Sequence, residues 1–126
     1  MNIIDSSGWL EVLVDGPNRP AFVQIIETGE LLVPAITILE VTKRVRQTQS
    51  AANADRVESH MRRFTVIDLT ADRASAAAAV SIRHKLPMAD SIIYAAALEF
   101  KATVWTQDED FDGLPQVRYF AKAARD

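Results

Sequence analysis

The stretch Thr103-Val104-Trp105-Thr106-Gln107-Asp108-Glu109-Asp110-Phe111 joins a short apolar run to a cluster of carboxylates. Near the N-terminus the run Asn2–Asp5 repeats this arrangement, because it too is apolar and ends at an acid. Further short apolar runs occur at Leu31–Val33, Thr65–Asp68 and Val117–Phe120. Runs of this length, rich in β-branched residues, are typical of buried strands. We therefore predict four strands, with Val117–Phe120 as a candidate fifth.

The segments between these runs have the apolar spacing of helices. The first would be capped by Ser6 or Ser7. The predicted helices cover Gly8–Val14, Arg19–Thr28, Thr37–Gln49, Asp55–Phe64, Ala71–Lys85 and Ala89–Lys101. Short strands that alternate with helices predict an α/β fold, with a central parallel sheet of four or five strands and helices on both faces. With no repeat or composition break, we expect residues 1–126 to form a single domain.

The composition of the chain excludes several classes of protein function. The 126 residues include no cysteine, which excludes disulfides and cysteine-bound zinc. The net charge of −3 argues against a protein that coats nucleic acid by charge alone, but it allows an enzyme whose acids gather in one cleft. No apolar run approaches the length of a membrane span, and no signal peptide is evident. We expect a cytoplasmic protein with no membrane association.

Two acids follow predicted strands. Asp5 ends the first strand, and Asp108 follows Thr103–Thr106. Carboxyl ends of parallel strands meet at one edge of a sheet, where the functional crevice lies. Asp5 alone would equally fit a turn or a helix cap. Of the acids that follow Asp108, Asp110 is a further candidate, whereas Asp112 fits a solvated loop.

Two more acids lie in apolar surroundings. Glu40 interrupts a nearly continuous apolar segment, where a charge is unfavourable unless it is paired or binds a cation. An ion pair with Arg44, four residues on, is the alternative. Asp90 opens an apolar, small-residue helix, where interaction with the helix dipole is the alternative. Converging carboxylates repel one another unless cations neutralise them. Their oxygen-only donor set suits Mg²⁺ or Mn²⁺.

Taken together, these segments resemble the PIN-domain family and, within it, the VapC toxins of bacterial toxin–antitoxin pairs. The resemblance spans essentially the whole chain. Four motifs carry it: Ile3-Ile4-Asp5-Ser6-Ser7, the segment from Pro34 to Glu40, Ala89-Asp90-Ser91-Ile92-Ile93-Tyr94-Ala95-Ala96-Ala97, and Thr106-Gln107-Asp108-Glu109-Asp110-Phe111. Ser6 stands where the family more commonly has Thr. The resemblance implies a metal-dependent endoribonuclease, often dimeric, that is inhibited by a cognate antitoxin.

On this interpretation Asp5 and Asp90 contact Mg²⁺ or Mn²⁺ directly. Glu40 and Asp108 complete the site, directly or through water, and the choice between Asp108 and Asp110 stays open. Ser6 and Thr106 would orient the ligands. The candidate contacts to the RNA backbone are Lys43, Arg44 and Arg83.

Two other functions compete with this interpretation. One is a receiver-like signalling module, because Val66-Ile67-Asp68-Leu69 resembles a phosphoacceptor strand end. A receiver would need an acidic pair after the first strand, where Ser6 and Ser7 stand, and a Lys after a late strand, whereas Lys101 precedes one. The other is a PIN-like fold that serves only as a regulatory binding module. The complete set of acids argues against that reading.

Overall fold

The computed structural model describes residues 1–122. Five strands form one sheet in the order β3-β2-β1-β4-β5, and every neighbouring pair is parallel. They are β1 (Asn2–Ile4), β2 (Leu31–Pro34), β3 (Thr65–Ile67), β4 (Thr103–Thr106) and β5 (Val117–Tyr119). The prediction of a parallel α/β sheet is confirmed, with the fifth strand present.

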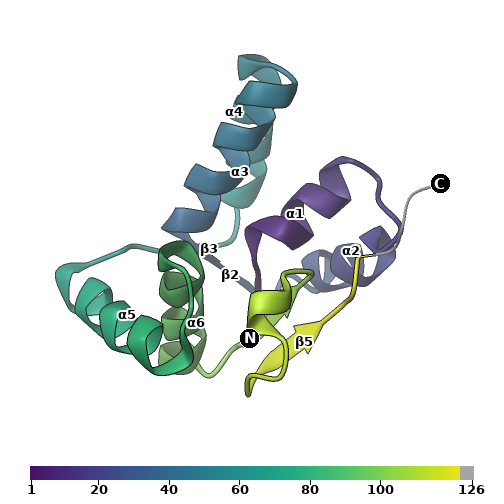
Figure 1. The fold of residues 1–126 in the computed structure, drawn as a ribbon. Coiled ribbons are helices and arrows are strands. Elements are labelled where there is room, and N and C mark those ends of the chain that lie inside the picture. The colour runs from purple at the N-terminus through teal and green to yellow at the C-terminus, as the bar shows by residue number, and fades with distance from the viewer. Residues whose placement is uncertain (123–126) are drawn as a thin grey trace.

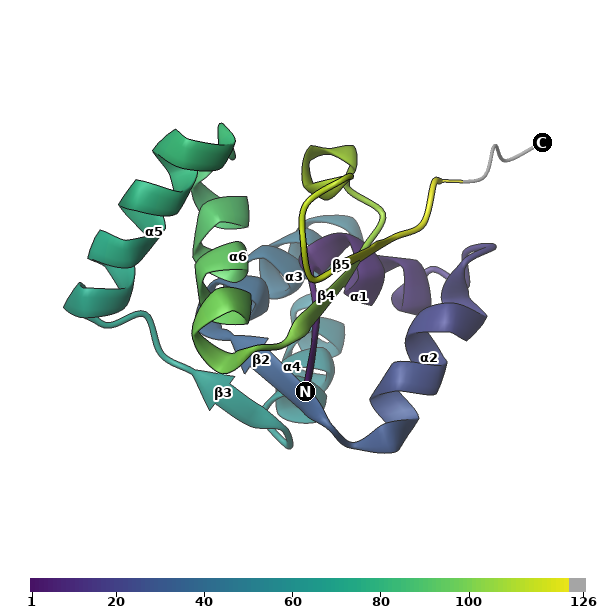
Figure 2. The ribbon, with the colours of Figure 1, turned by 90° about the horizontal axis from the view of Figure 1, so that it is seen from below.

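Six helices and one 3₁₀ turn connect the strands: α1 (Ser6–Leu13), α2 (Arg19–Thr28), α3 (Ala35–Thr48), α4 (Ala51–Met61), α5 (Ala71–His84), α6 (Met88–Phe100) and η1 (Glu109–Phe111). Helices α5 and α6 pack together on one side of the sheet, and α1 and α2 lie on the other (Figure 2). Helices α3 and α4 form a hairpin that projects from the body of the molecule (Figure 1).

The two faces of the sheet bury separate apolar clusters because successive strand residues point to opposite sides. Ile3, Leu32 and Val104 face α6, whereas Ile4 and Val33 face the α1–α4 side. Both clusters are almost fully shielded from solvent, so neither face of the sheet is free.

Helix α3 begins at Ala35 rather than at the predicted Thr37, and the structure also corrects the starts of α1 and α4. Asp5, not Ser6 or Ser7, caps α1, because Asp5 has an extended backbone and its side chain accepts a hydrogen bond from Gly8 N. Helix α4 begins at Ala51 rather than Asp55. Ser50 caps it by accepting from Asn53 N at 3.0 Å. In both cases a small polar residue at the helix start resembles a loop residue in sequence.

Strand order determines where function can lie. From the central β1 the chain runs outward through β2 and β3, and later returns to the other side of β1 as β4 and β5. The order therefore reverses between β1 and β4, and ligands of open α/β sheets bind at the carboxyl ends of such neighbouring strands. Asp5 follows β1 and Asp108 lies two residues beyond β4.

Within residues 1–122, none of the helices has the length and apolar character that a membrane crossing requires.

Candidate metal centre

Asp5 is both a helix cap and a member of the acidic cluster. Its carboxylate is buried, with 2% of the residue exposed. Oδ1 accepts from Ser7 Oγ at 2.7 Å and Gly8 N at 3.2 Å, and Oδ2 accepts from Thr106 Oγ1 at 2.7 Å. Burial raises the pKa of Asp5 to about 6, although these three hydrogen bonds oppose the shift, and the charge of Asp108 raises it further. The carboxylate is therefore held in one orientation.

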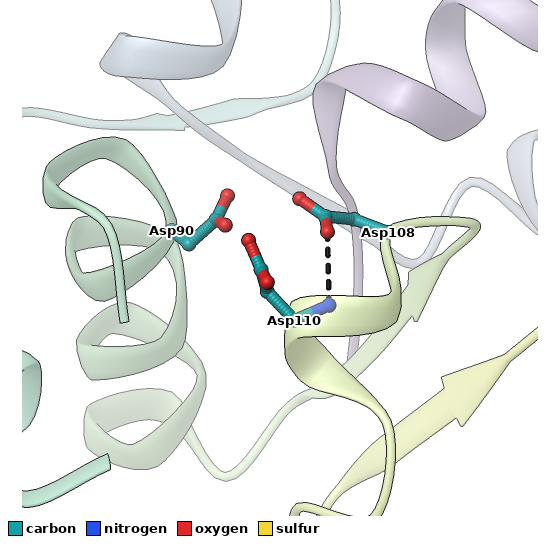
Figure 3. A group of neighbouring side chains, drawn as sticks. All are labelled: Asp90, Asp108 and Asp110. Atoms are coloured by element: carbon teal, nitrogen blue, oxygen red, sulfur yellow. Dashed lines mark hydrogen bonds between the residues drawn. The ribbon is translucent and has the colours of Figure 1, made fainter. Parts of the chain in front are cut away.

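Three more carboxylates lie close together, near enough to Asp5 for its charge to raise the pKa of one of them, Asp90. Oxygens of Asp90, Asp108 and Asp110 all lie within 4.8 Å of one another (Figure 3). Asp90 comes from the first turn of α6, while Asp108 precedes η1 and accepts from Asp110 N at 2.9 Å. Burial raises the pKa of Asp90 to about 8, and the neighbouring acids, Asp108 foremost, add to the shift. Without a cation, this cluster favours a proton on Asp90 at neutral pH.

Glu40 approaches the cluster from α3. Its pKa is raised, first by burial and then by the charge of Asp108, while a hydrogen bond from the Ser6 side chain opposes the shift. Oε1 is buried and has no hydrogen-bond partner among the described residues. The alternative ion pair with Arg44 does not form within that part of the chain. Glu40 thus has a buried, unsatisfied acceptor, which is unfavourable unless a ligand completes it.

The arrangement fits a divalent cation. The charge of Asp108 raises the pKa of Asp5, Glu40 and Asp90, so these three predicted acids lie within electrostatic reach of it. Of the three, only Asp90 has an oxygen within 4.8 Å of oxygens of both Asp108 and Asp110. The side chains of this set offer only oxygen donors to a metal, as Mg²⁺ and Mn²⁺ prefer. A cation would neutralise the mutual repulsion and satisfy Glu40 Oε1. Asp110, which the sequence left as an alternative to Asp108, lies beside it rather than replacing it.

The residues that orient the carboxylates are partly those predicted. Thr106 contacts Asp5, and Ser6 contacts Glu40. Sequence reasoning missed Ser7, which both donates to Asp5 and accepts from Gln107 N at 2.9 Å. A hydroxyl two residues after a capping acid is the signal that could have identified it.

The three residues predicted to contact RNA lie on two different helices, Lys43 and Arg44 on α3 and Arg83 on α5. Arg44 lines a surface hollow together with Ser6 and Ser7, next to the acids. Lys43 is exposed on the same helix. Arg83 lies at the end of α5 beside Tyr94, where its charge opposes the upward pKa shift that burial causes in that phenol.

Comparison with known proteins agrees with the fold. The model of the PIN domain family matches residues 3–116, so this chain belongs to the PIN-domain family. This membership and the acid set disfavour the receiver-like alternative. No curated protein matches the chain in sequence.

Several solved structures have a similar fold. The chain is similar to a toxin–antitoxin complex from Klebsiella pneumoniae, with 25% identity, a TM-score of 0.74, and coverage of 94% of this chain and 96% of the other. It shares its fold with the sarcin-ricin loop cleaving toxin VapC20 from Mycobacterium tuberculosis (14% identity, TM-score 0.77, 91% and 95% covered). It also shares the fold of DNA-bound VapBC from Salmonella typhimurium, with 16% identity, a TM-score of 0.74, and coverage of 96% of this chain and 98% of the other.

Proposed function

We propose that this PIN domain is a metal-dependent endoribonuclease and the toxin of a toxin–antitoxin pair. The observation that carries the proposal is the convergence of three carboxylates, Asp90, Asp108 and Asp110, at the switch point of the sheet. Asp5 and Glu40 belong to the same acidic cluster, because the charge of Asp108 raises the pKa of each. The similarity to the Klebsiella toxin–antitoxin complex supports the assignment to a toxin. The M. tuberculosis neighbour, described as cleaving the sarcin-ricin loop, supports RNA as the substrate class.

Asp90, Asp108 and Asp110 would hold Mg²⁺ or Mn²⁺, with Asp5 and Glu40 completing the donor set. A divalent cation there makes water easier to deprotonate and stabilises negative charge on a phosphodiester. The chain contributes orientation. Ser7, Gly8 and Thr106 fix both oxygens of Asp5, so this ligand needs no rearrangement when RNA binds.

The same cluster suggests how a partner protein would inhibit the enzyme. Metal-free, it has unneutralised negative charge, and Glu40 Oε1 lacks a hydrogen bond among residues 1–122. An arginine from a cognate antitoxin would satisfy such a site through charge-assisted hydrogen bonds. An antitoxin segment inserted there would compete with both cation and RNA.

RNA cleavage by the purified protein tests the proposal. We expect no cleavage in EDTA, recovery with Mg²⁺ or Mn²⁺, and loss of activity in Asp5→Asn. Asp110→Asn and Asp112→Asn form a matched pair, because only Asp110 belongs to the cluster. The first should impair cleavage and the second should leave it intact. Cleavage that persists in EDTA through repurification would contradict a metal-dependent mechanism, and a stably folded protein that never cleaves RNA would favour the binding-module alternative.

A further inference from the structure

We propose that the surface hollow between α1, α3 and the chain's last described residues is a nucleotide subsite, which seats one unit of a single-stranded RNA next to the carboxylates. This inference rests on the proposed ribonuclease function and extends it. The hollow measures about 590 Å³, within the range of small-molecule sites. Its lining combines apolar Leu10 and Val14 with polar Ser7 and Gln107 and with two cations, Arg44 and Lys122.

The hollow shares a wall with the acidic cluster. Ser7 lines it and also donates to Asp5 Oδ1 at 2.7 Å. Gln107, the other shared residue, is only 5% exposed and immediately precedes Asp108. A nucleotide seated here would therefore be a direct neighbour of the phosphodiester at the carboxylates.

A second hollow continues the depression. It measures about 570 Å³ and is lined by Asp108, Glu109 and Tyr119. Ser7, Gln107 and Lys122 line both hollows, so the two adjoin along these residues. A depression that continues from the first hollow into the second, where it reaches Asp108, fits an extended strand. Single-stranded RNA can splay its bases into such recesses, whereas a duplex keeps them stacked.

The charges match a phosphate backbone. The acidic cluster repels RNA, so cations nearby are needed to hold the strand. Arg44 and Lys122 are both exposed, and neither forms an ion pair among the described residues. The hollow also contains Glu11, but this residue is 8% exposed, and its carboxylate accepts from Asn18 N at 2.9 Å.

Hydrogen bonds position one of these cations. Asn18 Nδ2 donates to Gln107 Oε1 at 2.8 Å and to the carbonyl of Ala121 at 3.0 Å. Asn18 thereby ties the segment that carries Lys122 to the wall shared with the acids. This bridge holds the backbone next to Lys122 before RNA binds, which is a feature of a preformed site.

Binding of a fluorescent single-stranded RNA tests the inference. The probe has about ten nucleotides, longer than one hollow requires. The Asp90→Asn protein is titrated into the probe in Mg²⁺ at several salt concentrations. This background variant is chosen because the proposed function predicts that it does not cleave the RNA. We expect Arg44→Gln and Lys122→Gln, each added to this background, to weaken binding about fivefold. Each should also reduce the salt slope by about 0.7. Lys101→Gln is the control, because it makes the same charge change at the amino end of β4, the opposite edge of the sheet.

A second variant tests the hollow without changing charge. Val14 is 51% exposed and lines the hollow, so Val14→Trp should fill it, retain the thermal stability of the parent and weaken RNA binding. If Arg44→Gln, Lys122→Gln and Val14→Trp bind the probe like the Lys101→Gln control, the subsite is wrong. It is equally wrong if these variants weaken binding of an antitoxin protein but not of RNA. Failure of the unmodified protein to cleave RNA in Mg²⁺ or Mn²⁺ would instead remove the proposed function, and the two failures are therefore distinguishable.

Discussion

Asp90→Asn should stabilise the metal-free protein at pH 8 while abolishing activity. The folded protein raises the pKa of Asp90 from 3.8 to about 8. Because the folded state holds this proton more tightly than the unfolded chain, the stabilising contribution is fully present below pH 4. It is lost as pH rises towards 8. Asp5, with a folded pKa of about 6, adds a second loss between pH 4 and 6.

The magnitude follows from the pKa shift. At about 1.4 kcal/mol per pKa unit, the full shift of Asp90 would correspond to about 6 kcal/mol. Asp90 is only half-buried, and solvent screening reduces the expected effect to about 1–2 kcal/mol. Loss of its favourable interaction with the α6 dipole costs about 0.3–1 kcal/mol. We therefore expect Asp90→Asn to be about 1 kcal/mol more stable than wild type at pH 8. At pH 4 the two proteins should be close in stability, because the Asp90 carboxyl of the folded wild type is already protonated there.

Urea unfolding at both pH values in EDTA, followed by circular dichroism, measures this difference. Asp72→Asn is the matched control, because Asp72 occupies the first turn of α5 as an exposed residue. It should show only the dipole loss, with no change of sign between pH 4 and 8. Adding Mg²⁺ should then stabilise wild type and Asp72→Asn more than Asp90→Asn. Equal pH and Mg²⁺ responses in the two variants would refute the placement of Asp90 in a metal centre.

Three further outcomes are expected. Ser7→Ala removes a donor to Asp5 and the acceptor of Gln107 N. The free energy of unfolding should therefore fall by about 1–3 kcal/mol, and RNA cleavage should decrease. An unchanged melting temperature and unchanged cleavage would count against the role of this hydroxyl. Gly8→Ala places a methyl group 2.5 Å from Ile4 Cγ2 and 2.7 Å from Phe22 Cε1. The substitution should therefore destabilise the folded protein by about 1–3 kcal/mol, as measured by thermal unfolding. Unchanged stability would show that the Phe22 ring moves aside. Expression of the wild type should slow bacterial growth, and a small neighbouring antitoxin should relieve it; the toxin assignment fails if Asp90→Asn, at equal soluble expression, is as harmless as wild type.

Much of the fold was predictable because its signals are local. A continuous apolar run of three or four residues is sufficient to indicate a strand buried on both faces. Ile3 and Ile4, for example, are adjacent and face opposite clusters. Short strands alternating with helices then imply parallel pairing, because a parallel connection needs a crossover. The acids too were recognisable, since a carboxylate at a strand end or in an apolar helix stands out against its immediate neighbours.

Tertiary structure decided how those acids are arranged. Asp110 joins Asp90 only because packing places η1 beside the first turn of α6, a placement that depends on contacts between distant segments (Figure 3). The same holds for Asn18, which reaches Gln107 across 89 positions of the chain and has no local pattern to mark it. A sequence states which groups are unusual for their surroundings, whereas the distances between those groups, and hence their pKa values and ligands, exist only once the chain has packed.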